Sequence, residues 1–496
     1  MASGRLAIGA TATFLSTLAA FGGVGATACT ASKGEAAPAA PAASTAHVAD
    51  GDPAPRHDAR RSGRIGAPGI GDPDFPADGN GGYDVEHYGL RIGYDPPSRR
   101  LEGVATITAK ATQDLDAFNL DLSGFRVARV TVDGRAATFA RAGTELTVTP
   151  ATPLPASGRF TVVVSYDGEP KPITGSSNLG TYGFIPTRDG AFVTSEPNGA
   201  KTWFPGNDHP ADKAGYDFEV TVPAGLTVLA NGEMVGAPVT SGGRTTFRWR
   251  ESHPMATYLA TITLGRFELR QGTTASGIAN LAAVDPRYRD SLGRLYSQSG
   301  RITDYWSTVF GPYPFSSTGG VIDDFSAGYA LENQTKPMYG GFVPDDDTVA
   351  HELAHQWFGD SLSIRRWKDL WLNEGFATYA EWLWKEHNGV PAERSFRATY
   401  DAHPAGDAIW KYPPGRAQPQ DLFNDSVYRR GGMALHALRR SIGDAAFFKV
   451  LRTWTAEHRY GYVTTEEFVA LAERISGRQL DALFDAWLFK PVRPAA

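Results

Sequence analysis

The chain has 496 residues, enough for two or three domains with well-buried cores. Its hydrophobic content of 42% and charged content of 21% are ordinary for a soluble globular protein. The formal net charge of −6 lacks the basic excess that nucleic-acid-binding proteins usually show, so we expect no nucleic-acid partner.

Residues 1–28 are predicted to form an export signal. Arg5 is the only charge before an apolar stretch, and the small residues Ala26-Thr27-Ala28 at its end suit signal-peptidase cleavage. Cys29, the only cysteine, comes next and resembles the lipid-bearing cysteine of a bacterial lipoprotein. We expect a bacterial protein that is secreted, or anchored on the outer face of the cell membrane through a lipidated Cys29. Cleavage that leaves Cys29 on an unmodified tail is the alternative.

Residues 29–80 are rich in Ala, Pro, Gly and Asp and contain few large apolar residues. Such a segment cannot bury enough surface to offset the entropy cost of ordering it. A flexible linker between the export signal and the first folded domain is therefore predicted.

Residues 81–267 show the period-2 alternation of β-strands. Alternate positions from Tyr88 to Tyr94 are apolar, and similar runs follow between Gly and Pro residues. One run ends in the turn pair Asp133-Gly134. The prediction is an N-terminal β domain of antiparallel sheets that pack on each other as a sandwich or saddle.

The strongest motif in the chain is His351-Glu352-Leu353-Ala354-His355. Residues four apart share one face of a helix, so both imidazoles can reach one ion. Three aspartates before the motif suit a helix N-terminus, and Gly359 is predicted to end the helix. Two neutral imidazoles suit Zn²⁺, which also takes a third protein ligand and a water. Glu352 lies between the two histidines and is predicted to be the general base.

A second motif, from Trp371 to Tyr379, begins another helix that is predicted to end at Asn388-Gly389. Glu374 follows His355 with room for the first helix to end and an antiparallel helix to begin. Its carboxylate is predicted to complete a site of His351, His355 and Glu374 for one Zn²⁺ per chain. A chance occurrence of the first motif on a surface helix is the alternative, and the second motif argues against it.

These motifs resemble the zinc aminopeptidase family that includes aminopeptidase N and leukotriene hydrolase. The likeness covers about residues 83 to 496 and is most specific in the two zinc motifs. The resemblance implies an α+β multidomain fold, in which the β domain precedes a mainly α, thermolysin-like zinc peptidase domain at residues 268–496. Three blocks of the β domain also match, namely Tyr83–Tyr88, the run of Phe204-Pro205, Asp208, Pro210 and Lys213-Ala214, and Pro254–Leu259.

Ala330, Leu331, Glu332 and Asn333 resemble the family's GAMEN motif, a strand along which the substrate backbone lies. A free α-ammonium needs an anionic partner near the metal, and Glu332 is the candidate. The alternative for Glu332 is a surface carboxylate. Tyr329 stands where the family has Gly, and Leu331 replaces Met, so the first-residue pocket is expected to differ in shape.

The resemblance assigns two further residues. Glu196 aligns with a Gln or Glu that reaches from the β domain as a second amine anchor; otherwise it is a loop acid beside a proline. Tyr428 begins a run that resembles the family's Tyr-x-Lys-Gly element, and a phenol can donate to an oxyanion without adding a charge. A packed helix tyrosine is the alternative for Tyr428, and Arg429 and Arg430 are expected to be surface charges.

After about residue 390 the pattern is helical. Longer family members continue into a further β domain and a large helical domain, so a short form with an open cleft is expected. The predicted activity is zinc-dependent removal of the first residue from peptides with a free N-terminus. Glu352 is expected to serve as base, the zinc to activate a water, and Tyr428 to stabilise the oxyanion. Alternatives are an endopeptidase of the same zinc class, an enzyme resembling the family's epoxide hydrolase, and a non-catalytic peptide-binding protein.

Overall fold

The computed structural model describes residues 64–176 and 179–495. The predicted export signal, Cys29 and the linker as far as residue 63 lie outside the described residues. Within the described ranges, no helix combines the length and the apolar character needed to cross a membrane.

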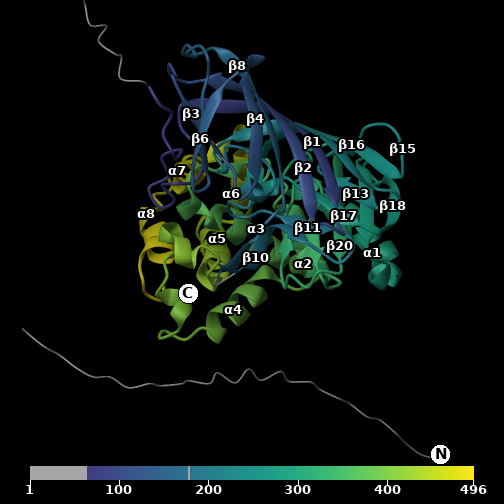
Figure 1. Cartoon of the computed structure of the whole chain (residues 1–496). Helices are drawn as coiled ribbons and strands as arrows, with labels where there is room; N and C mark the ends of the chain where they lie inside the picture. Colours follow the sequence, from purple (N-terminus) through teal and green to yellow (C-terminus); the bar gives the residue numbers. More distant parts are fainter. Residues whose placement is uncertain (1–63, 177–178, 496) are drawn as a thin grey trace, which may run out of the picture. The chain divides into compact units, whose positions relative to one another are not determined.

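A long sheet in the first half of the chain has the strand order β14-β16-β12-β1-β2-β8-β4-β5, with β15 paired to β16. Figure 1 labels β1, β2, β4, β8, β15 and β16 of this sheet. The alternate apolar residues from Tyr88 to Tyr94 are buried, as their spacing predicts. Asp133 and Gly134 have φ angles of 50° and 75° and form the predicted turn between β4 and β5. The strands are β1 (Tyr83–Asp95), β2 (Arg100–Ala111), β4 (Arg126–Val132), β5 (Arg135–Ala136), β8 (Arg159–Gly168), β12 (Lys213–Pro223), β14 (Glu233–Met234), β15 (Val239–Ser241) and β16 (Arg244–Ala256).

One pair in this sheet departs from the predicted antiparallel arrangement. β1 and β12 run parallel, with Tyr88 opposite Tyr216 and Leu90 opposite Phe218. Parallel neighbours need a long crossover, and residues 96–212 supply it. The rings of Tyr88 and Tyr216 stack with centroids 4.9 Å apart, which stabilises the pair in the core.

Two smaller sheets lie in the same half of the chain. Their strand orders are β13-β17-β11-β10-β9 and β3-β7-β6. β11 ends at Thr194, so the loop that follows it carries Glu196. The strands are β3 (Phe118–Asp121), β6 (Thr138–Ala142), β7 (Glu145–Thr149), β9 (Ile173–Ser176), β10 (Gly180–Pro186), β11 (Ala191–Thr194), β13 (Thr227–Ala230) and β17 (Ile262–Gly265).

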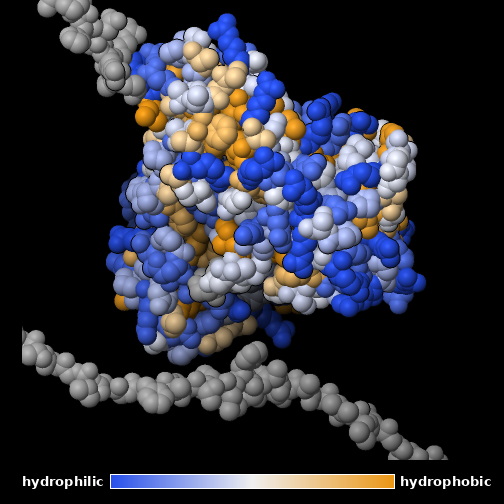
Figure 2. Space-filling view, viewed as in Figure 1, coloured by the Kyte–Doolittle hydropathy of each residue, from blue (hydrophilic) through white to orange (hydrophobic). Residues whose placement is uncertain are grey.

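Figure 2 shows hydrophilic residues over most of the visible face. Apolar side chains gather on this face near the strands labelled β4 and β6 in Figure 1, and Phe139 of β6 is 39% exposed. The buried apolar residues of the strands and of the helices described below form one continuous core.

Residues 64–80, predicted as part of the flexible linker, instead pack on the folded body. Asp72 is buried, and its Oδ2 accepts a hydrogen bond from Trp367 N at 2.8 Å and lies 3.4 Å from His209 Nε2. Asn80 is also buried. The linker prediction is therefore wrong for this part. Polar side chains attach the segment together with Phe75, whose ring centroid lies 5.9 Å from that of Trp367, and composition does not reveal such contacts.

From residue 268 the chain forms a mixed sheet in the order β18-β19-β20-β22-β21. Helix α1 (Leu292–Val309) packs against β18, β19 and β20. The short strand β21 carries the Ala330-Leu331 pair at an edge of this sheet, antiparallel to β22. The strands are β18 (Glu268–Thr273), β19 (Ala279–Val284), β20 (Ser317–Asp323), β21 (Ala330–Leu331) and β22 (Met338–Gly340).

Helices follow this sheet, as the sequence predicts. α3 ends before Asn388-Gly389, but α2 ends at Ala354 instead of continuing to Gly359. The backbone widens there because the carbonyl of His355 accepts a hydrogen bond from Asp360 N, five residues later, at 3.0 Å. α2 packs on α3, and α3 packs on α5. The helices are α2 (Asp346–Ala354), α3 (Trp371–His387), α4 (Ala392–Ala402), α5 (Gly431–Ile442), α6 (Asp444–Glu457), α7 (Thr465–Ser476) and α8 (Asp481–Phe484), with a small pair of strands, β23 (Ser363–Ile364) and β24 (Tyr462–Val463).

Candidate metal and substrate site

Helix α2 places His351 and His355. Asp345 caps this helix, with its Oδ1 accepting a hydrogen bond from Thr348 N at 2.9 Å, as the aspartates before the motif predict. The two imidazole rings lie one helical turn apart, with centroids 4.8 Å from each other. α2 therefore presents both rings to a common point.

Glu374 reaches the same point from the first turn of α3. Its Oε2 lies 3.3 Å from His351 Nε2 and 3.4 Å from His355 Nε2. Burial acts to raise the pKa of Glu374, but the imidazoles of His355 and His351 outweigh it and lower this pKa below its ordinary value. Two imidazole nitrogens and one carboxylate oxygen, all within 4.8 Å of one another, are the donor set of a catalytic zinc site.

The other ring nitrogens of both histidines have partners. His351 Nδ1 lies 2.8 Å from Glu381 Oε1, and His355 Nδ1 donates to the carbonyl of Phe358 at 3.0 Å. Such partners fix the ring orientation and leave Nε2 for a metal ion, so the residues fit zinc. Sequence reasoning missed Glu381. It lies two helical turns after Glu374 on the same face of α3, and this spacing was the available signal.

More carboxylates surround this point. Donor atoms of Glu332, Glu352 and His355 lie within 4.8 Å of one another. The carboxylate oxygens of Glu196, Glu332 and Glu374 also lie within 4.8 Å of one another. The structure thus brings together acids from the β domain, from the residue that follows β21, from α2 and from α3. They are buried, so the site concentrates negative charge away from water.

Burial has strong effects on these acids. It raises the pKa of Glu352 to about 7, although His351 and His355 act in the opposite direction. Burial, followed by the charge of Glu332, raises the pKa of Glu196 well above its usual value. Buried carboxylates need cationic partners to stay ionised. A metal ion at the histidines and an ammonium group between Glu196 and Glu332 would both meet this need.

The residues around Glu332 have different environments. Ala330 lines an open pocket of about 340 Å³ that is also lined by Phe342, Glu352 and Glu381. Leu331, the second residue of β21, is buried. Asn333 is fully buried, and its Nδ2 donates to the carbonyl of Leu259 at 2.9 Å, so it attaches the segment to the β domain. The Oε1 of Glu332 has no hydrogen-bond partner within the described chain.

Tyr428 lies beside the metal ligands. Its ring is 6.3 Å from that of His351 and nearly parallel to it, at 17°. Tyr428 belongs to η8 (Ser426–Arg430), a wide π-type turn before α5. Burial, followed by the charge of Glu374, raises the pKa of the Tyr428 phenol well above its usual value. The phenol therefore keeps its proton and can act as a hydrogen-bond donor.

Two glycines bring Tyr428 close to Glu374. A Cβ atom on Gly375 or on Gly431 would lie only 2.9 Å from the Cα of the other, so both positions require glycine for α3 and α5 to approach this closely. Gly375 directly follows Glu374, and Gly431 follows Tyr428 by three residues. This backbone contact places the phenol at the metal site.

The expectation of surface charges after Tyr428 holds for only one of the two arginines. Arg429 is exposed and lies 3.6 Å from Asp425. Arg430 is fully buried, and it donates hydrogen bonds to the carbonyls of Trp487 at 2.7 Å and Trp410 at 3.0 Å. The prediction is wrong for Arg430, because free carbonyls at helix ends satisfy its guanidinium.

The departure at Tyr329 has a structural consequence that the sequence did not predict. Its phenol donates a hydrogen bond to the carbonyl of Thr181 in β10 at 2.8 Å, and lies 2.8 Å from Thr194 Oγ1 in β11. Thr194 precedes Glu196 by two residues. Tyr329 therefore connects the strand segment of Glu332 with the loop of Glu196.

Two family models match the chain. A Peptidase M1 N-terminal domain matches residues 84–259, and a Peptidase family M1 domain matches residues 345–487. The second match includes the three candidate metal ligands, Glu352 and Tyr428.

Curated proteins of this kind resemble the chain over part of their length. The chain is 29% identical over 321 residues to Aminopeptidase M1 of Arabidopsis thaliana. The matched region covers 60% of this chain and 36% of that protein. It is also 29% identical over 329 residues to Aminopeptidase N of Lactococcus lactis. This matched region covers 60% of this chain and 38% of that protein. The chain thus spans little more than a third of the length of these relatives.

Solved structures are similar over nearly their whole length. The M1 zinc metallopeptidase from Deinococcus radiodurans has a TM-score of 0.80 at 28% identity, covering 86% of this chain and 98% of that chain. A variant of that enzyme bound to the substrate Tyr-Ser-Ala has a TM-score of 0.77 at 27% identity. This match covers 86% of the present chain and 98% of the variant's chain. This likeness confirms the predicted fold class, a β domain followed by a mainly helical metallopeptidase domain.

Proposed function

Because this chain belongs to the M1 family of zinc metallopeptidases, we propose that it is an aminopeptidase that hydrolyses the first peptide bond of peptides with a free N-terminus. One observation carries the proposal. The buried carboxylates of Glu196 and Glu332 lie within 4.8 Å of the ligand Glu374, although the metal site itself needs only one carboxylate. An α-ammonium group beside the metal site accounts for the additional pair.

His351, His355 and Glu374 would hold one zinc ion. When bound, zinc supplies a Lewis acid that polarises a carbonyl and lowers the pKa of a water. Glu381 and the carbonyl of Phe358 orient the two imidazoles for this role.

Glu352 is proposed as the general base. Its carboxylate oxygen lies within 4.8 Å of donor atoms of His355 and Glu332, so it faces both the metal ligands and the amine anchor. A base with a pKa near the working pH can take a proton from the attacking water and then return it to the leaving amine. Burial raises the pKa of Glu352 from its ordinary value towards this range.

Tyr428 is proposed to donate a hydrogen bond to the oxyanion of the tetrahedral intermediate. Its phenol is protonated and adjacent to the histidine ligands, as this role requires. Glu196 and Glu332 are proposed to hold the substrate's ammonium from two sides. A blocked N-terminus would leave these acids buried without a cation, and this cost selects free peptides.

The localisation and the division of the chain are also proposals. We propose a signal at residues 1–28, a β domain at 81–267 and a peptidase domain at 268–496. Secretion, or attachment to the outer face of a bacterial membrane through Cys29, would suit an enzyme that acts on peptides outside the cell. Labelling of the expressed full chain with a fatty-acid analogue, compared with a Cys29→Ala variant, would test the attachment.

Hydrolysis of a panel of aminoacyl-arylamides and of one N-acetylated peptide tests the activity. With zinc bound, we expect release from the free-amine substrates only, and a zinc chelator should abolish it. Cleavage of the N-acetylated peptide would instead indicate an endopeptidase of the same zinc class, with Glu332 and Glu196 in another role.

A further inference from the structure

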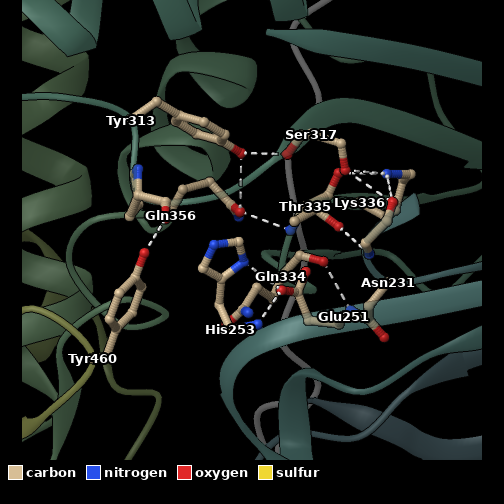
Figure 3. A network of polar contacts seen from close by, with 12 residues as sticks. Asn231, Glu251, His253, Tyr313, Ser317, Gln334, Thr335, Lys336, Gln356 and Tyr460 are labelled. Carbon is tan, nitrogen blue, oxygen red and sulfur yellow. Dashed lines mark hydrogen bonds and ion pairs between the residues drawn. The ribbon is translucent and has the colours of Figure 1, made fainter. Parts of the chain in front are cut away.

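Gln356 directly follows the second histidine and is completely buried. Its side-chain amide makes two hydrogen bonds to one segment of chain. Nε2 donates to the carbonyl of Glu332 at 2.9 Å. Oε1 accepts from Thr335 N at 2.7 Å (Figure 3). A single side chain next to a metal ligand is thus bonded to the backbone of the proposed amine anchor.

The segment that Gln356 contacts, residues 332–336, has a strained conformation. Lys336 N donates to the carbonyl of Asn333 at 2.8 Å, which closes a turn. Thr335 has a φ of 65°, in the left-handed region that β-branched residues rarely adopt. Such a conformation persists only where surrounding contacts impose it. The position of Glu332 therefore depends on the contacts made by this turn.

On its other side the turn is attached to the β domain. Asn231 Nδ2 donates to the carbonyl of Gln334 at 2.8 Å, and Gly232 N donates to Thr335 Oγ1 at 2.7 Å. The buried ammonium of Lys336 donates to the carbonyl of Gly232 at 3.0 Å and to Ser317 Oγ at 3.2 Å. Figure 3 shows these residues converging on Thr335 from one side and Gln356 from the other.

We infer that Gln356 is a positioning residue that sets where Glu332 stands relative to the metal ligands. The carboxylate of Glu332 has an oxygen without a hydrogen-bond partner in the described chain, so side-chain contacts alone do not fix it. Its backbone carbonyl is fixed by Gln356, whose neighbour His355 is a proposed zinc ligand. Gln356 thus couples the amine anchor to the metal site, and a misplacement of about 1 Å in such a site can cost about a hundredfold in rate.

This inference rests on the proposed function, in which Glu332 binds the substrate's ammonium. Two zinc-binding inhibitors separate its test from that of the function. Leucine hydroxamate carries an α-ammonium group, and isocaproyl hydroxamate has the same skeleton without the amine. The ratio of their inhibition constants measures the amine anchor alone, because both ligands use the same metal-binding group.

Gln356→Met removes the two hydrogen bonds to the turn, together with a longer one at 3.5 Å that Oε1 accepts from the Tyr313 phenol, and keeps much of the side-chain volume. On the zinc-loaded variant we expect leucine hydroxamate to bind about tenfold or more weakly, with the constant for isocaproyl hydroxamate changed less than about threefold. Zinc content per chain should equal that of the wild-type protein. Equal weakening of both inhibitors, or no change in either, would overturn the inference. If the wild-type protein shows no preference for the amine, the proposed function fails instead.

Two further variants complete the test. Gln298→Met removes another buried glutamine, which bonds to Asp346 at the opposite end of α2, and it should leave the inhibitor ratio unchanged. Combining Gln356→Met with Glu332→Ala should cost no more amine preference than Glu332→Ala alone, because Gln356 acts through Glu332. If the losses of amine preference from the two single substitutions add up in the double variant, the inference is contradicted.

Should Gln356→Met fail to fold, Gln356→Asn is the replacement, because it shortens the same side-chain amide by one carbon. The ratio of the two inhibition constants then decides in the same way.

Discussion

His351 and Glu381 are joined across two helices, with His351 Nδ1 2.8 Å from Glu381 Oε1. The carboxylate comes from the second turn of α3 after Glu374, so the helix that supplies the third ligand also orients the first. Glu381 is only partly buried, with 27% of its side chain exposed. Its substitution should therefore act on the metal site and leave the core intact.

We predict that Glu381→Ala lowers zinc affinity by about 10- to 100-fold, because an unsupported imidazole is a weaker and less ordered ligand. Competition with a fluorescent zinc chelator measures this affinity. Glu386→Ala is the matched control. Glu386 lies on the same helix but pairs with Arg439, so its loss should leave zinc affinity unchanged. Equal affinities for the Glu381 variant and the wild-type protein would contradict the assignment.

Replacement of Glu352 by Gln should separate metal binding from catalysis. The amide keeps the shape of the side chain but cannot accept the proton from water, so kcat should fall by about 10²- to 10⁴-fold or more. Zinc content, measured by elemental analysis, should stay at one ion per chain because Glu352 is not a proposed ligand. Full activity in this variant would refute its role as base.

Tyr329→Phe tests the connection between the two proposed amine anchors, Glu196 and Glu332. The variant keeps the ring and loses the hydrogen bonds to Thr181 and Thr194, so the loop of Glu196 loses a contact with the segment of Glu332. We expect KM for free-amine substrates to rise about three- to tenfold, with kcat within about twofold. Tyr296→Phe removes a remote phenol bonded to the carbonyl of Thr273 and should change neither constant. A fall in kcat at constant KM would point to a role for Tyr329 in the chemical step.

The stability of the protein should depend on pH through Lys213. Burial lowers the pKa of Lys213 to about 7 from an ordinary value of 10.5, with Asp360 acting in the opposite direction. Between these values the unfolded chain binds a proton that the folded chain does not, so the free energy of unfolding rises with pH. One proton gives at most about 1.4 kcal/mol per pH unit.

Urea unfolding of the wild-type protein and of Lys213→Met between pH 7 and pH 9 measures this contribution. The wild-type free energy of unfolding should rise with pH relative to that of the variant. Lys110→Met, at an exposed lysine on β2, should keep the wild-type slope. Parallel curves for the wild-type protein and Lys213→Met would show that Lys213 stays protonated in its partly buried position, where it donates to the carbonyls of Asp360 and Ser361.

The sequence by itself determined the features that depend on local geometry. The spacing of His351 and His355 places both imidazoles on one helical face whatever surrounds the helix, and alternation from Tyr88 to Tyr94 specifies a half-buried strand. Glu374 was identifiable because its motif begins a helix at a suitable distance along the chain. The assignments of Glu332, Glu196 and Tyr428 came from the family resemblance, and the structure places all three beside the metal ligands.

Only the tertiary structure decided the features that join distant parts of the chain. The parallel pairing of β1 with β12, the burial of Asp72 and the contact of Gly375 with Gly431 have no local signature. The same holds for the phenol of Tyr329 and the amide of Gln356, whose partners lie on other elements. A side-chain hydrogen bond acts over about 3 Å, and the sequence does not specify which groups folding brings within that range.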